Sequence, residues 1–133
     1  MSRRDLVSSI NAAITLAPAA RTTTANGTAV DLNGYEMAAA VITSGTITDG
    51  SNYVFEVQHS DDNSTWAAVA DDELVGAEPT LTAADDNAVR KIGYRGRKRY
   101  LRVSLSSVTG SPSTGGVLSA VIIRSGARVA PLS

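Results

Sequence analysis

Regular alternation over residues 52–59 constrains the fold more strongly than any other feature of the sequence. Tyr53 and Phe55 begin a run in which every second residue is apolar, and a period of two places such side chains on one face of a β-strand. After a turn, residues 65–69 repeat an extended pattern around Trp66, which predicts an antiparallel hairpin. We therefore expect both aromatic residues of the first strand and Trp66 to lie in the core.

Short extended segments recur at roughly ten-residue spacing from residue 28 onward, separated by turn residues such as Asn33 and Gly34. Most carry apolar residues on one face and polar residues on the other, as the strands of a sandwich do. The sequence therefore predicts an all-β fold, an antiparallel β-sandwich of jelly-roll type. The other predicted strands are 28–32, 37–47, 88–94, 99–108 and 117–123.

Two of these predicted strands depart from the pattern of one apolar and one polar face. Residues 117–123, with the sequence VLSAVII, are apolar on both faces, so we expect this strand to be buried on both faces or nearly so. Residues 37–47 begin with three alanines after a methionine, and this small-residue start could sit against a close neighbour.

The first 27 residues lack the strand pattern. Leu6, Val7 and Ile10 recur at helix-like intervals, so residues 4–13 are the one helical candidate, although so short a helix needs tertiary support. We expect an extended or partly helical N-terminal arm over residues 1–27, a β-sandwich domain over 28–127 and a C-terminal tail over 128–133.

Length and composition limit the classes of protein further. A chain of 133 residues with 43% hydrophobic residues can build one core but has little room for a second domain. Without cysteine it can form no disulfide, thiolate metal site or cysteine nucleophile. No stretch approaches the roughly 20 apolar residues of a membrane helix, and polar residues interrupt the N-terminal apolar stretch, so we expect neither membrane association nor a secretory signal.

Catalytic candidates are few. His59 is the single histidine, and it precedes Ser60 and Asp61 directly. Successive side chains of a strand point to opposite faces, so these three neighbours are poorly placed for a catalytic triad. The sequence predicts no catalytic residue and no cofactor, and it places His59 at a strand end on the surface.

Acidic residues occur in runs at 61–62, 71–73 and 85–86. Calcium requires six to eight converging oxygens, often at alternating loop positions with a glycine, and none of these runs has that pattern. Asp and Asn are more simply explained as turn residues whose side chains bind nearby backbone. We expect solvated turns and no metal, with calcium binding left as an alternative.

Charge is strongly segregated along a chain whose formal net charge is only −1. Residues 22–89 hold twelve acidic and no basic residues, whereas residues 90–133 hold nine basic and no acidic ones. The basic strands could pair with the acidic part of the same chain, bind an acidic protein surface or bind nucleic acid, and the near-zero total argues against nucleic acid. The basic segment, residues 90–102, contains Arg90, Lys91, Arg95, Arg97, Lys98, Arg99 and Arg102, with Tyr94 and Tyr100 among them.

A partner interface would draw on this segment, on the N-terminal arginines and on tyrosines beside glycines or charges, because tyrosine offers contact area at low entropic cost. For the tyrosines, half-buried positions in the sandwich are an equally good explanation. The interface candidates are Arg3, Arg4, Tyr35, Tyr94, Arg95, Arg97, Lys98, Arg99, Tyr100 and Arg102.

Several runs, taken together, resemble small structural proteins of tailed bacteriophages, encoded beside the major capsid protein. The resemblance implies a capsid decoration (cement) protein, or a minor head or tail component, because such cement proteins are commonly β-sandwiches or jelly rolls that bind the shell as oligomers. The runs are 26–35, 57–66, 81–86, 92–102 and 114–117.

The expected function is non-enzymatic: binding to the major capsid protein shell and to neighbouring copies of itself, which stabilises the shell. The expected location is the capsid surface of a virion assembled in the host cytoplasm. The alternatives are another head or tail role, or a carbohydrate- or receptor-binding module. A carbohydrate module would need exposed aromatic platforms, which the loops at 60–64 and 109–116 lack.

Overall fold

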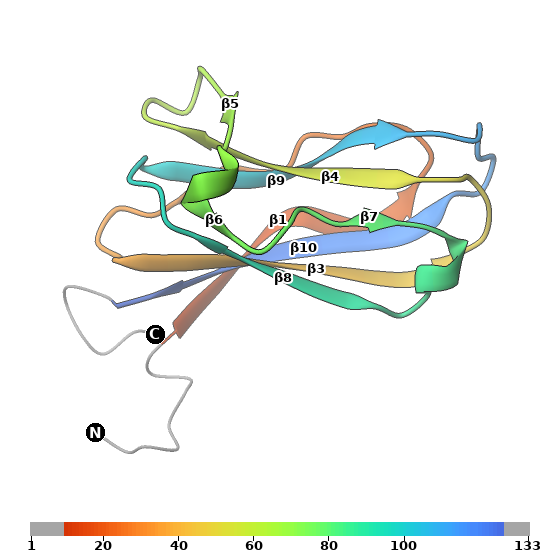
Figure 1. Cartoon of the computed structure of the whole chain (residues 1–133), viewed down its shortest axis with the longest axis horizontal. Helices are drawn as coiled ribbons and strands as arrows, with labels where there is room; N and C mark the ends of the chain where they lie inside the picture. The colour runs from red at the N-terminus through yellow and green to blue at the C-terminus, as the bar shows by residue number, and fades with distance from the viewer. Residues whose placement is uncertain (1–9, 127–133) are drawn as a thin grey trace, which may run out of the picture.

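The computed structural model describes residues 10–126, which form two antiparallel sheets stacked as a β-sandwich (Figure 1). The first sheet has the order β1(Ile10–Arg21), β10(Gly116–Ser125), β3(Met37–Ile47), β8(Val89–Tyr94) and β6(Leu74–Val75). The second has the order β2(Val30–Asp31), β9(Tyr100–Val108), β4(Tyr53–Ser60) and β5(Ala67–Ala68), and β7(Thr80–Leu81) also pairs with β4. Two short 3-10 helices, η1(Asp71–Glu73) and η2(Ala83–Asp85), complete the described chain. The predicted all-β sandwich is confirmed.

The core lies between the two sheets and is built from every second residue of the long strands. In β4, Tyr53, Phe55 and Val57 are almost completely buried, while the residues between them are partly exposed, as the alternation predicts. Leu105 of β9 lies beside Phe55 in the same sheet, and Ile42 of β3 contributes to the core from the first sheet. The sequence pattern therefore identified the inward face of β4 correctly.

The N-terminal segment differs from the expected arm. Residues 10–21 form β1, an edge strand of the first sheet that pairs antiparallel with β10, so residues 10–13 are extended and not helical. Backbone pairing with a long neighbouring strand satisfies the polar groups that a short helix leaves unsatisfied. The register of β1 shifts twice, around Leu16, and the strand contains Pro18, which an edge strand tolerates; both features obscure the period of two. Arg3, Arg4 and the predicted tail over 128–133 lie outside the described residues.

Trp66 is not a core residue. It precedes a β5 of only two residues, and both Ala67 and Ala68 are exposed, so the second strand of this hairpin covers little of the core. The indole ring is half-buried and stacks under the guanidinium of Arg102, whose Cζ lies 4.2 Å from the ring centroid. A large aromatic residue near a turn thus packs on the outer surface of the second sheet.

Within residues 10–126, no helix has the length and apolar character needed to cross a membrane.

Candidate partner interface

The basic segment lies where the chain crosses from one sheet to the other. Arg90 and Lys91 lie on β8 of the first sheet, and Arg102 lies on β9 of the second. The connection over residues 95–99 therefore runs across one end of the sandwich. It carries four of the seven basic side chains, and so concentrates positive charge at that end.

Several basic side chains pair with the acidic part of the same chain. Lys98 Nζ lies 2.8 Å from Asp61 Oδ2. The Arg99 guanidinium binds the Asp31 carboxylate with two parallel hydrogen bonds of 3.0 and 2.9 Å, and this contact lowers the pKa of Asp31. At the other end of β8, Arg90 pairs with Asp85 at 3.1 Å. The predicted pairing between the basic and acidic parts of the chain is confirmed for these residues.

Arg95 and Arg97 remain outside these pairs. Both side chains are exposed, and neither makes a hydrogen bond or ion pair with another residue of the described range 10–126. The backbone N–H of Arg95 donates to the carbonyl oxygen of Glu73, which fixes the start of the connection without engaging the guanidinium. The connection thus presents to solvent two exposed guanidinium groups that are unpaired within the described chain.

The three candidate tyrosines have different environments. Tyr94 is buried with 9% of its surface exposed, and burial raises the pKa of its hydroxyl. Tyr35 is half-buried, and the guanidinium carbon of Arg124 lies 4.7 Å from its ring centroid. Tyr100 is half-buried, and the guanidinium carbon of Arg99 lies 5.1 Å from its ring centroid. Tyr94 is therefore chiefly a core residue, whereas the other two keep part of their rings at the surface.

His59 is buried, contrary to the expected surface position. Only 6% of its surface is exposed, and its Nδ1 lies 2.8 Å from the hydroxyl oxygen of Tyr94. Burial lowers the pKa of His59, although the Glu73 carboxylate 4.0 Å away opposes the shift. The signal was present in the sequence, since His59 continues the inward alternation of Tyr53, Phe55 and Val57.

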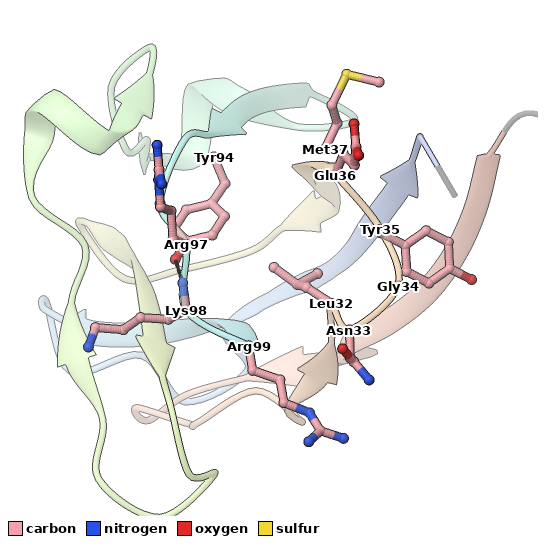
Figure 2. Close-up of a pocket in the computed structure, with 11 residues that line it drawn as sticks. Leu32, Asn33, Gly34, Tyr35, Glu36, Met37, Tyr94, Arg97, Lys98 and Arg99 are labelled. Atoms are coloured by element: carbon pink, nitrogen blue, oxygen red, sulfur yellow. Dashed lines mark hydrogen bonds between the residues drawn. The ribbon is translucent and has the colours of Figure 1, made fainter. Parts of the chain in front are cut away.

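An open cavity of about 620 Å³ lies between the turn that joins β2 to β3 and the opposite wall, which Tyr94 and the connection 95–99 form (Figure 2). Leu32 occupies its middle, while Tyr35 and Lys98 extend in opposite directions from its two walls. Met37, with 58% of its surface exposed, and Arg97 also line it, so its walls combine apolar and cationic groups. Sequence reasoning missed this cavity because its walls lie about sixty positions apart in the chain.

Aspartates of the acidic turns accept hydrogen bonds from nearby backbone N–H groups. Asp62 accepts hydrogen bonds from the N–H groups of Ser64 and Thr65 and from the Ser60 hydroxyl, which lowers the pKa of its carboxyl well below the ordinary range. This confirms the turn interpretation for the run at 61–62. Asp85 likewise caps η2 through the backbone N–H of Thr82. Within residues 10–126, no group of three or more histidine, cysteine, aspartate or glutamate side chains is arranged to hold a metal ion.

Asp49 holds the connection between β9 and β10 from a distant part of the chain. Its carboxylate accepts backbone hydrogen bonds from Ser113, Thr114 and Gly115 at 2.9, 3.1 and 2.6 Å, and these lower the pKa of Asp49 to about 2. These partners lie more than sixty positions from Asp49, so no local sequence pattern indicates the contact. Asp49 thus fixes the part of this loop that is formed by Ser113, Thr114 and Gly115.

We expect acid to destabilise the protein through these carboxylates. Because the pKa of Asp49 is lower in the folded chain than its ordinary 3.8, the unfolded chain binds protons first as the pH falls. The contribution is complete above pH 3.8 and is lost as the pH falls toward about 2. Urea unfolding of Asp49→Asn should show a weaker pH dependence than wild type in this window. Equal dependence in both proteins would contradict the role given to Asp49.

Comparison with known proteins agrees with the phage resemblance at the level of the family. The profile of the Bbp16 family matches residues 19–122, which run from the last part of β1 to β10 and include both walls of the cavity. No curated protein matches the chain significantly. Because the family match covers most of the chain, the protein belongs to the Bbp16 family, a phage-associated family.

Proposed function

We propose that this chain is a non-enzymatic capsid decoration protein that binds the major capsid protein shell and stabilises it. The family is phage-associated, and the earlier resemblance to structural proteins of tailed phages points in the same direction. The shell-binding surface is the end of the sandwich that carries Leu32, Tyr35, Met37, Arg95 and Arg97, which we name the end surface.

The observation that carries this proposal is the pair of exposed arginines on the connection 95–99, of which Arg97 lines an open, partly apolar cavity. Arg95 and Arg97 have no acidic partner within residues 10–126, although Lys98 and Arg99 on the same connection do. Protein interfaces are enriched in tyrosine, methionine and arginine, and complementary charge fixes the orientation of the partners. An acidic patch on the shell would pair with the two arginines that have no partner in the described chain. Glu36, on the opposite wall of the cavity, would help to fix the orientation of the bound protein.

The surroundings of the single histidine support a structural role. His59 is buried between β4 and β8 and hydrogen-bonded to Tyr94, and it does not line the cavity. The carboxylates at Asp49, Asp62 and Asp85 are occupied by backbone groups. These four side chains thus maintain the fold, which supports binding, rather than chemistry, as the activity of the end surface.

Binding to undecorated shells should depend on salt. We expect purified protein to sediment with shells at low ionic strength, and its affinity to fall roughly tenfold between about 50 and 200 mM NaCl, because exposed charge pairs are screened. Sedimentation of the bound fraction over a salt series measures this. No binding at low salt would overturn the proposal. Binding to single-stranded DNA or to a glycan array, with none to shells, would favour the alternatives instead.

A further inference from the structure

The outer face of the first sheet is mostly apolar, and Thr43 and Ser119, which hydrogen-bond to each other, are among its few polar positions. The strand registers place Ile14, Val121, Val41 and Lys91 in one row across β1, β10, β3 and β8. The next row consists of Ala12, Ile123, Ala39, Gly93 and Val75. Lys91 is the only charged side chain at the outward positions of this sheet within residues 10–126.

The outward apolar side chains at the edges and strand ends of this face are open to solvent in the single chain, whereas the central Val41, Val121 and Ile123 are half-buried among their neighbours. Ile14 is 55%, Val75 50%, Val89 64% and Val117 41% exposed. Strand β10 is therefore apolar on both faces, as residues 117–123 predict, but only its inner face is covered within the described structure. An antiparallel sheet normally turns a polar face to water, so this face lacks the composition of a solvated surface.

The second sheet provides the contrast within the same molecule. Its outward positions around Gln58 are polar and bonded to one another: Arg102 Nε donates to Gln58 Oε1 at 2.7 Å, and Gln58 also binds Glu56 and Ser104. Among the residues that the structure describes, the uncovered apolar outer face thus belongs to the first sheet. The asymmetry marks the first sheet as the side that meets another protein surface.

The size of the apolar face fits one specific kind of occupant. The five strands hold 41 residues, and with a spacing of about 4.8 Å between strands and a rise of about 3.3 Å per residue they give a face of roughly 650 Å², at the lower end of the standard size. A standard protein interface buries about 800 Å² from each partner. A sheet face of this extent is best covered by an equally flat sheet face, because two sheets pack in register with about 30° between their strands.

We infer that the outer face of the first sheet packs against the same face of a second copy of this chain, which gives a two-fold dimer. The two-fold axis would lie between the first sheets of the two copies, parallel to the central strand β3. It places β8 of one copy over β10 of its partner, so the two Lys91 ammonium groups are kept apart rather than opposed. Val41, at the centre of β3, then lies near the axis, where each copy meets its own equivalent. This dimer does not depend on the end surface or on shell binding.

Sedimentation equilibrium of the full chain tests this inference directly. Wild type is expected at twice the chain mass of 13.7 kDa. Val41→Lys places a charge in the centre of the apolar interface and should weaken the dimer about 100-fold or more. Val54→Lys is the matched control, because Val54 is a half-buried valine at an outward position of β4 in the other sheet, and its dimer should be unchanged.

Circular dichroism establishes that each variant is folded. If Val41→Lys does not fold, Ile14→Lys at a position 55% exposed replaces it and should weaken the dimer. A monomeric wild type would overturn the inference. In that case another surface, such as that of a shell, would have to cover the face. A dimer that both folded lysine variants leave intact, or that Val54→Lys disrupts equally, would overturn it as well.

Discussion

Phe55→Ala is expected to lower the free energy of unfolding by about 3–5 kcal/mol, the range typical of a large buried aromatic residue replaced by alanine. Phe55 is 1% exposed on the inward face of β4, a central strand of the second sheet. Its removal leaves a cavity between two sheets whose backbones are held by long antiparallel ladders, so the surroundings can collapse only partly. Urea unfolding followed by circular dichroism measures the loss.

Trp66→Ala is the informative comparison, because the sequence predicts both aromatic residues in the core. Trp66 is half-buried on the outer surface and loses mainly its contact with Arg102, so the expected cost is about 1 kcal/mol. Equal losses for Phe55→Ala and Trp66→Ala would show that the hairpin packs differently from the structure described here.

Reversing the charge of both free arginines should have the largest effect on shell binding. The double variant Arg95→Glu, Arg97→Glu is expected to weaken binding to undecorated shells about 100-fold, because like charges then face the acidic surface that the proposal requires. Both side chains are exposed and have no ion pair within residues 10–126, so the fold should be unaffected. Titration of labelled protein against shells gives the affinity.

Arg90→Glu provides a control for a charge reversal elsewhere in the basic segment. Arg90 lies at the other end of β8 and pairs with Asp85, so its replacement disturbs only an exposed ion pair of small energy. We expect shell affinity within about threefold of wild type for this variant, because exposed charges distant from an interface contribute little. Equal weakening by Arg90→Glu and by the double variant would mean that overall charge, and not the end surface, governs binding.

The sequence was most informative where alternation is regular and the strand is long. The predicted strand 37–47 coincides with β3, and 88–94 and 99–108 agree with β8 and β9 to within one residue at their starts. In β1 the alternation is broken by two register shifts around Leu16, so the periodicity of single residues could not reveal the pairing with β10. Local patterns identify strands, but a bulged edge strand is defined by its neighbour.

The candidate interface was predictable in its charge but not in its shape. Charge segregation along the chain indicated pairing within the chain as one of its alternatives, and the structure shows it in Arg99 with Asp31, which are sixty-eight positions apart. Which cations stay unpaired depends on the geometry of the connection 95–99, and no spacing rule distinguishes Arg97 from Lys98. The cavity likewise forms only when the turn after β2 meets that connection across the sandwich. For His59, by contrast, the alternation of β4 indicates an inward, buried position, but the turn residues that follow it led to the prediction of a surface position.

Saturation of purified undecorated shells with the full-length protein tests the central claim most directly. A decoration protein occupies a defined set of sites, so the bound protein should level off at a fixed whole-number ratio to the major capsid protein and should raise the temperature at which the shells disrupt. Quantitative gel analysis of sedimented shells measures the ratio. Binding that never saturates, or saturation at a ratio that varies between shell preparations, would contradict the assignment of this chain as a capsid decoration protein.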